Sequence, residues 1–390
     1  MQVRLKCRWL TLLLLTLLTC GLSVGISRGL AIAPTPVSPQ PYQWELPAWA
    51  PRPVVPADNP MSVVKVELGR HLFYEKRLSV TGEFSCATCH LQSKAFTDGK
   101  QVSIGATGEA HPRNSMSLTN IGYNSVLTWA NPLMRSLEQQ MLVPLFGEHP
   151  VEMGMAGRES EIITMLKHSP EYARMFADSF PADADPITIR NVTKAIAAFE
   201  RSLVSFNSPY DRYRYGGETD AISESAKRGE ALFHSERLEC FHCHGGLNFS
   251  DSTVHERSGF PEIAFHNTGL YNLDGHGAYP PDNTGIHEIT HRPEDMGRFK
   301  APTLRNIALT APYMHDGSIA TLEEAIAHYS AGGRTITSGP NAGVGRNNPF
   351  KSTFIQGFEI SDAEKADLLS FLHSLTDLSF VQNPKLSDPH

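Results

Sequence analysis

The chain has 390 residues with a composition ordinary for a globular protein, and its formal net charge is −7. This length allows about two domains. Residues 1–33 carry four basic and no acidic side chains, so the charge falls from −7 to −11 without them. A chain this acidic, with no basic cluster, does not fit a nucleic-acid-binding protein.

The first 33 residues have the pattern of a secretory signal peptide. Basic residues at positions 4, 6 and 8 precede the apolar run WLTLLLLTLLTCGL, and small residues follow at positions 31 and 33. The run is too short for a membrane span, and no second one follows, so we expect no transmembrane span in the mature chain. We therefore predict export to the periplasm. Cys20 is an alternative lipidation site, although Thr19 before it fits poorly.

The rest of the chain predicts a mainly α protein behind a proline-rich arm. Residues 34–60 contain many prolines and should form an extended arm rather than a domain. Residues 188–205 and 361–376 have helical patterns, and no strand-rich region stands out. The polar, turn-rich stretch 207–220 is the expected boundary between two domains.

Two cysteine motifs dominate the mature chain. They read CATCH, with Cys86, Cys89 and His90, and CFHCH, with Cys240, Cys243 and His244. In a CxxCH motif the thiols attach haem c, and the adjacent histidine ligates the iron. A zinc site or a redox dithiol would compete as the explanation of a single motif.

An internal repeat surrounds both motifs. ELGRHLFYEKRLS (67–79) parallels AKRGEALFHSERL (226–238), and KAFTDG (94–99) loosely echoes LNFSDS (247–252). Each unit reads as a short helix leading into a haem site. We therefore predict two cytochrome c-like haem domains in tandem with long loops, covering residues 61–215 and 216–390.

A helix with a tyrosine on its apolar face is predicted near the end of the second domain. Thr321 and Glu324 form a capping box, and glycines at 332 and 333 end the helix. Leu322, Ile326 and Tyr329 share one face, so Tyr329 should point inward. By itself this pattern favours a core tyrosine with a hydrogen-bonded hydroxyl.

Two further patterns place polar side chains at helical spacing. Leu133, Leu137, Gln140 and Pro144 form one helical stripe, which sets an amide among apolar groups. The histidines of GIHEITHRP, at 287 and 291, are spaced like a metal pair. Since no third ligand is suggested, we favour surface or propionate-facing histidines.

The sequence from about residue 60 to 376 resembles the bacterial di-haem cytochrome c peroxidase and MauG-like superfamily. The resemblance rests on the two CxxCH motifs, on PRNSMSLTN (112–120), on SLEQQMLVPLFGEHPVEMG (136–154) and on FKAPTLRNIALTAPYMHDGS (299–318). The amino-acid sequence around the second motif is most similar to that of the MbnH-type di-haem enzymes. The resemblance implies two covalently bound haems c and a reaction with hydrogen peroxide.

The resemblance also implies the axial ligands. Peroxidases of this family carry a methionine ligand 14 residues after the histidine of HDG, and MauG-like enzymes carry a tyrosine, which is Tyr329 here. An anionic phenolate favours oxidised iron. His328 is the nearest rival but lies about 100° off the apolar stripe. At the first haem, Ala106 stands where peroxidases have a switch histidine, so that iron should be open, with His111 as a possible substitute.

Four residues match the family's peroxide-reacting pocket and its electron relay. Glu152 matches the acid/base glutamate, and Gln140, with Pro144 on its stripe, matches the distal glutamine. Trp129 matches the tryptophan between the two haems. The loop between Gln140 and Glu152 is two residues longer than the common pattern. Without the resemblance, Glu152 would read as a solvated loop carboxylate and Trp129 as core packing.

A calcium site between the haems is also implied by the resemblance. Its ligands would be Asn114 with the backbone carbonyls of Thr310 and Pro312, and hard oxygen donors suit that ion. The alternative is that these segments are only turns.

The implied function is a di-haem oxidoreductase that uses hydrogen peroxide to reach a high-valent state and then oxidises a side chain of a periplasmic partner protein. For the MbnH branch that side chain is tryptophan. Leu238 stands where MauG has a surface tryptophan, so the sequence does not identify the route by which the oxidising equivalent leaves the protein. The alternative is a cytochrome c peroxidase fed by a small cytochrome or cupredoxin. A pure electron carrier would give Gln140 and Glu152 no role.

Overall fold

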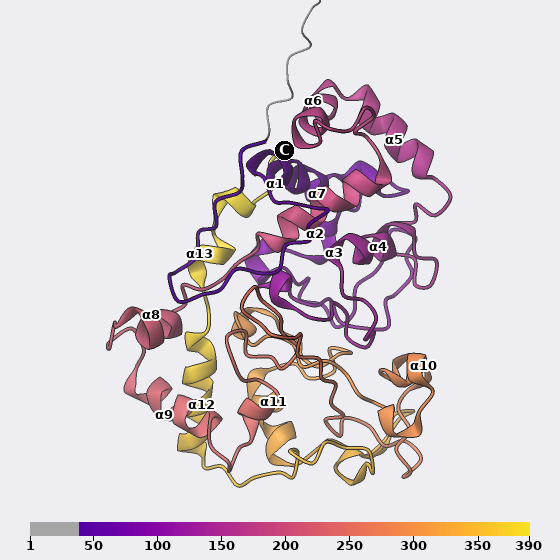
Figure 1. Ribbon diagram of the computed structural model, residues 1–390. Helices are drawn as coiled ribbons and strands as arrows, with labels where there is room; N and C mark the ends of the chain where they lie inside the picture. The colour runs from indigo at the N-terminus through magenta and orange to yellow at the C-terminus, as the bar shows by residue number, and fades with distance from the viewer. Residues whose placement is uncertain (1–38) are drawn as a thin grey trace, which may run out of the picture. The chain divides into compact units, whose positions relative to one another are not determined.

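A computed structural model describes residues 39–390, so the predicted signal peptide and the first residues of the arm lie outside the described part (Figure 1). Within that part, the mainly helical prediction is confirmed, and β1 (Thr335–Ile336) and β2 (Gly343–Val344) make a single short antiparallel pair. The α-helices are α1 (Val63–Tyr74), α2 (Cys86–Cys89), α3 (Leu137–Gln140), α4 (Leu142–Phe146), α5 (Glu159–His168), α6 (Pro170–Ser179), α7 (Ile189–Arg201), α8 (Pro209–Gly216), α9 (Glu224–Phe233), α10 (His287–Thr290), α11 (Leu322–Ser330), α12 (Asp362–Ser374) and α13 (Leu378–Val381).

The first hydrophobic core forms where α1 crosses α7. Gly69 makes the crossing close, because a Cβ atom at this position would lie 1.9 Å from the carbonyl oxygen of Ala195 and 2.9 Å from Cβ of Phe199. Leu68, Leu72 and Phe199 are completely buried around it. A larger residue at 69 would force the two helices apart.

The second core repeats this crossing with α9 and α12, which lie side by side (Figure 1). A Cβ atom at Gly229 would lie 2.0 Å from the carbonyl oxygen of Asp367 and 2.9 Å from Cβ of Phe371. The two glycines hold the same position in the internal repeat, since each lies three residues before a Leu-Phe pair, at 72–73 and at 232–233. The same helix pair is therefore built twice from sequence that is only loosely similar.

Each of the two cores contains residues from the other half of the chain. Ala130, from the N-terminal half, belongs to the second core, while Phe380 and Leu386, from the C-terminal end, belong to the first. The hydroxyl of Tyr74 on α1 donates to the carbonyl of Leu386 at 2.7 Å. The last residues of the chain thus return to α1, where α13 runs beside the first core (Figure 1).

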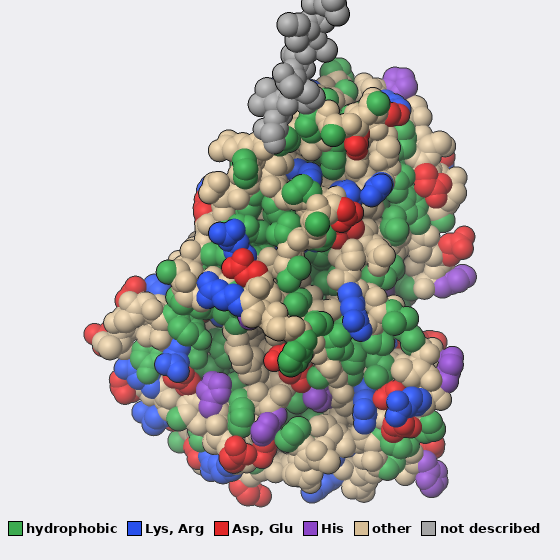
Figure 2. Space-filling view, viewed as in Figure 1, with side chains coloured by type: hydrophobic (Ala, Val, Ile, Leu, Met, Phe, Trp, Pro, Cys, Tyr) green, Lys and Arg blue, Asp and Glu red, His purple; other side chains and the backbone are tan. Residues whose placement is uncertain are grey.

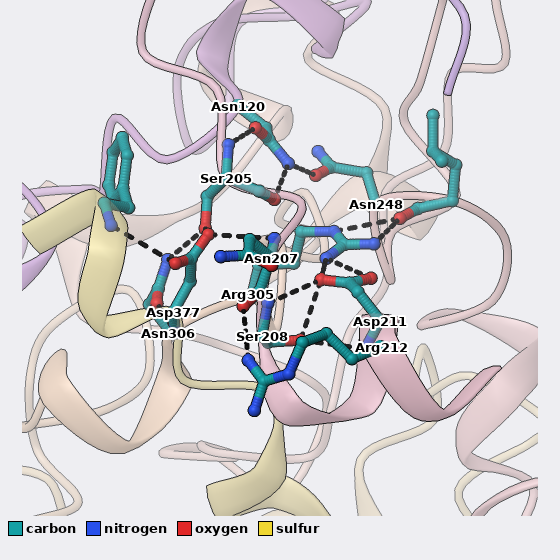
Figure 3. Close-up of polar contacts among 12 residues, drawn as sticks. Asn120, Ser205, Asn207, Ser208, Asp211, Arg212, Asn248, Arg305, Asn306 and Asp377 are labelled. Carbon is teal, nitrogen blue, oxygen red and sulfur yellow. Dashed lines mark hydrogen bonds and ion pairs between the residues drawn. The ribbon is translucent and has the colours of Figure 1, made fainter. Parts of the chain in front are cut away.

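A polar junction between the cores repeats as well. Asn120 and Asn306 both have positive φ angles, of 55° and 60°. Asn120 accepts from the backbone N–H of Ser205, and Asn306 accepts from that of Asp377, each at 2.7 Å (Figure 3). The pairing joins LTNI (118–121) to the end of α7 and LRNI (304–307) to the end of α12. This second pair of repeated segments was not recognised in the sequence.

The polar stretch 207–220, in which we place the boundary between the two domains, contains the helix α8. Ser208 caps α8 at its N-terminus, and Tyr210 and Asp211 are buried at 4% and 2% exposure. Asp211 is paired inside the protein although the stretch is polar. The domain boundary stays a prediction. The arm packs against this region, since Trp49 stacks on Tyr215 with ring centroids 4.0 Å apart.

No helix in residues 39–390 has both the length and the hydrophobicity needed to cross a membrane. On the face shown in Figure 2, basic and acidic side chains are interspersed.

Candidate functional site

A cavity of about 440 Å³ lies in the second core. Cys240, Cys243 and His244 line it together with Trp129 and Tyr329. Its volume is in the range of small-molecule and cofactor sites. The second CxxCH motif and the tyrosine of α11 therefore line one cavity.

Both motif histidines are oriented in the same way. Nδ1 of His90 lies 2.8 Å from the carbonyl oxygen of Phe96, and Nδ1 of His244 lies 3.1 Å from that of Phe249. Such a bond fixes the ring and leaves Nε2 for a metal. Burial lowers the pKa of both imidazoles, which favours the neutral form that binds iron.

Tyr329 lies on α11 as predicted. Thr321 caps this helix by accepting from the N–H of Glu324, while the Glu324 carboxylate bonds the N–H of Ala320 rather than that of the cap residue. Burial raises the pKa of the Tyr329 phenol well above its ordinary value. The rival His328 turns to the carbonyl oxygen of Thr268, 3.1 Å from its Nε2, and does not line the cavity.

Two buried nitrogen groups on the cavity wall have no partner within the described chain. They are Nζ of Lys300 and Nε2 of His315, on side chains 2% and 4% exposed. Burial lowers the pKa of Lys300 to about 7 and that of His315 to about 4. A buried amine or imidazole nitrogen without a partner is costly, so these two positions suit a ligand group that accepts hydrogen bonds, such as a carboxylate. The two carboxylates of a haem would supply these partners, so the residues of the cavity fit that group.

Near the first CxxCH motif, the loop that contains Ala106 packs against the loop that contains Glu152. The N–H of Ala106 donates to the carbonyl oxygen of Glu152 at 2.7 Å, and a Cβ atom at Gly105 would lie 1.9 Å from the carbonyl oxygen of Val151. The Glu152 side chain is 33% exposed but is otherwise surrounded by protein. This burial raises its carboxyl pKa to about 7. Nε2 of His111 lies 3.9 Å from its Oε1.

The predicted helical stripe through Gln140 is wrong in its first half. Leu133 lies outside the helices and is 70% exposed, and the helix is interrupted at Met141, between α3 and α4. Gln140 is the last residue of α3. Pro144 lies in α4, and its carbonyl accepts from the N–H of Met153 at 2.9 Å, which ties α4 to the Glu152 loop.

Trp129 lies at the second cavity and is hydrogen-bonded to a segment that contacts the first CxxCH motif. It lines the second cavity, and its Nε1 donates to the carbonyl oxygen of Asn114 at 2.8 Å. The next residue after Asn114, Ser115, donates from its hydroxyl to the carbonyl oxygen of Cys89 in the first motif, at 2.7 Å. The tryptophan is therefore anchored one residue away from a contact with the first CxxCH motif.

The predicted calcium ligands lie around the same segment. Asn114 is buried, its N–H donates to the carbonyl of His315 at 2.8 Å, and its amide nitrogen donates to the carbonyl of Lys100 at 2.8 Å. Thr310 and Pro312 precede His315 in the same loop. The calcium site stays a prediction. The histidines at 287 and 291 lie in or next to α10, outside the cavity lining.

Comparison with known proteins decides the family. A family model described as di-haem cytochrome c peroxidase matches residues 64–220. The methylamine utilization protein MauG of Methylophilus methylotrophus is 32% identical over 82% of this chain and 84% of its own. The chain belongs to the di-haem cytochrome c peroxidase and MauG family. Its members are haem oxidoreductases that use peroxide, and the family implies two c-type haems.

Relatives in this family carry names of both kinds. The cytochrome c peroxidase IdrP1 of Denitromonas iodatirespirans is 34% identical over 93% of this chain and 96% of its own. The crystal structure of a MauG-like protein associated with microbial copper homeostasis has 52% identity and a TM-score of 0.87, covering 89% of this chain and 99% of that one. The names alone do not distinguish protein oxidation from peroxide removal.

The sequence analysis did not assign a role to several residues that contribute to the two sites. These are the carbonyls of Phe96 and Phe249, the unpaired groups of Lys300 and His315, and the buried ion pair between Arg305 and Asp211. Phe96 and Phe249 lie in the repeated segments 94–99 and 247–252, and Arg305 lies in LRNI, which repeats LTNI, so the internal repeats were the available signal for these three residues.

Proposed function

We propose that this protein uses hydrogen peroxide to oxidise a tryptophan of a periplasmic partner protein. The observation that carries the proposal is that Tyr329 lines the same cavity as His244, while His328 is turned away from it. A tyrosine ligand favours oxidised iron, which suits an enzyme that stores an oxidising equivalent rather than one that is readily reduced by a small cytochrome.

In this proposal each cysteine pair tethers one haem, His90 and His244 ligate the irons, and Tyr329 is the second ligand at the C-terminal site. Bound haem supplies the redox chemistry of peroxide cleavage and stores the oxidising equivalents. Because burial raises the pKa of the free phenol, Tyr329 needs a bound cation to exist as phenolate. Lys300 and His315 would hold the haem carboxylates.

The protein's own part at the first site is proton transfer. The Glu152 carboxylate would take the proton from one oxygen of hydrogen peroxide and return it to the other oxygen, which would leave as water as the O–O bond breaks. With its pKa near 7, this carboxyl can both accept and donate at neutral pH. Gln140 would orient the peroxide, and Ala106 leaves room for it where a ligating histidine would compete.

Trp129 would carry charge between the two sites, and a calcium ion at Asn114, Thr310 and Pro312 would hold the segment between them. The partner would belong to copper handling, since the 52% identical structure is described as associated with copper homeostasis. The exported location rests on the signal-peptide pattern in residues 1–33.

The second candidate is a peroxidase that removes hydrogen peroxide with electrons from a small cytochrome or cupredoxin. It is favoured by the peroxidase names among relatives of similar identity. The two functions differ in where the electrons come from.

One experiment separates them. The haem-loaded protein is mixed with peroxide and a periplasmic extract of its own cells, with or without a reduced small cytochrome, and the extract is analysed by mass spectrometry. We expect oxygen added to a tryptophan of one protein, with no need for the cytochrome, and no product with Glu152→Gln. Peroxide turnover that depends on the cytochrome, with no modified protein, would establish the peroxidase instead.

A further inference from the structure

Three successive carbonyls of the loop behind His244 are each held by a different side chain. Leu247 accepts from Arg305 Nε at 3.0 Å and from Nη2 at 2.7 Å, Asn248 accepts from the hydroxyl of Thr303 at 2.6 Å, and Phe249 accepts from the imidazole of His244. The first two contacts fix the backbone immediately before the carbonyl that orients the histidine.

This loop has a backbone conformation that needs support. Phe249 has a φ angle of 49°, which side-chain-bearing residues rarely adopt, and it is 3% exposed. Such conformations persist only when surrounding contacts hold them. The Arg305 guanidinium lies 5.6 Å from the centre of the Phe249 ring, so the same arginine contacts both the backbone and the side chain of the loop.

Arg305 is itself held by a buried carboxylate. It is 1% exposed, and its Nη1 lies 3.0 and 2.9 Å from the two carboxylate oxygens of Asp211 on α8 (Figure 3). Asp211 also accepts from the hydroxyl of Ser208 at 2.7 Å. Because a buried pair costs desolvation, it contributes only where its geometry is fully satisfied, as it is here.

The first site lacks a buried ion pair of this kind, although the rest of the arrangement around its histidine is repeated. Ser117 donates to the carbonyl of Ala95, as Thr303 does to that of Asn248, both at 2.6 Å. At the position that matches Arg305 the first half has Thr119, an uncharged residue. The ion pair is therefore specific to the site where Tyr329 is found.

We propose that Arg305, held by Asp211, is a positioning residue for His244: it fixes the loop Gly245–Phe249 and thereby the orientation of the imidazole at the second haem only. This inference rests on the proposed role of His244 as an iron ligand. It goes beyond that role by assigning the asymmetry between the two sites to a buried ion pair.

The test uses the haem-loaded protein and records electron paramagnetic resonance spectra and the reduction potential of each haem. Arg305→Lys keeps the charge but loses the planar fork that contacts Leu247 and Asp211 together. We expect the second haem's low-spin signal and its potential to shift, with the first haem unchanged in the same sample. The matched control is Arg212→Gln, which removes an exposed arginine of the same helix region that pairs with Glu218.

Thr303→Val gives a milder second variant, since it removes the hydroxyl's bonds to Asn248 and to the backbone N–H of Arg305 but keeps the ion pair between Arg305 and Asp211. It should shift the low-spin signal of the second haem in the same direction by a smaller amount. If Arg305→Lys does not fold, this variant alone tests the proposal. Signals of the second haem that equal wild type in the folded variants would overturn the proposal. A wild-type protein without a histidine-ligated second haem would instead contradict the proposed haem site itself.

Discussion

The backbone N–H of Ala106 donates a 2.7 Å hydrogen bond to the carbonyl of Glu152, so the position of the proposed acid depends on a neighbouring loop. Gly105 brings the loops together, because a Cβ atom there would lie 1.9 Å from the carbonyl oxygen of Val151. Gly105→Ala should displace Glu152 and slow the reaction with peroxide by about 10². Stopped-flow absorbance measures this rate.

The control for that variant is Gly108→Ala in the same loop. Gly108 has a φ of +87° but no atom within 4 Å of a Cβ, so alanine costs backbone strain without moving Glu152. It should lower stability and leave the peroxide rate near wild type. Equal rates in both variants would show that the contact with the Glu152 loop does not matter.

The raised pKa of Glu152 predicts a pH dependence. Burial moves this carboxyl from its ordinary range to about 7, so the carboxylate that accepts the peroxide proton forms as pH rises through 7. The peroxide rate should increase over that interval. Glu152→Gln should slow the reaction by about 10² to 10⁴ and remove the pH dependence, because the amide cannot take the proton. A profile with the same midpoint in Glu152→Gln would assign the titration to another group.

The two helix crossings predict matched losses of stability. Gly69→Ala and Gly229→Ala each place a methyl group within 2.0 Å of a facing backbone oxygen, so each should lower the free energy of unfolding by about 2–4 kcal/mol. Thermal unfolding measures the change. Gly216→Ala in α8, whose nearest atoms lie 3.8 Å away, should be neutral or stabilising. A tolerated alanine at 69 or 229 would mean that the helices separate without cost.

A substitution of Trp129 should slow charge transfer between the two sites while both haems stay attached. Trp129→Phe keeps an aromatic ring but removes the 2.8 Å bond from Nε1 to the carbonyl of Asn114. We expect peroxide to react with the first haem at the wild-type rate while oxidation of the partner falls at least about tenfold, since phenylalanine is a poor charge carrier. Rapid-mixing spectra and mass spectrometry report the two steps. Trp49→Phe, in the arm, is the matched control and should change neither.

The sequence predicted the features that depend on local pattern or on close resemblance. The capping signals around Thr321 located α11, and the internal repeat located a helix ahead of each CxxCH motif, which are α1 and α9. Both predictions were possible because a cap and a helical pattern are visible within a few residues of sequence. The close crossings at Gly69 and Gly229 were not predicted, since the facing helices α7 and α12 are far away in the sequence.

Long-range pairing explains what was missed. The buried pair of Asp211 with Arg305 was not predicted, because the two residues lie 94 positions apart and polarity alone does not reveal a buried pair. The helix through Gln140 was drawn too long, because the apolar spacing of Leu133 resembles that of a core residue although its side chain is exposed. The support of His244 by Phe249 involves only backbone carbonyls, which any residue supplies.

The central claim is that Tyr329 ligates the second haem, and spectroelectrochemistry of wild type and Tyr329→Met tests it most directly. Replacing an anionic phenolate by a thioether should raise the potential of that haem by on the order of 0.1 V, with both haems still attached. His328→Gln, at the neighbouring position whose imidazole bonds Thr268, should leave the potential unchanged. If Tyr329→Met leaves the potential and the oxidation of the partner as in wild type, Tyr329 is a core tyrosine and the account is wrong.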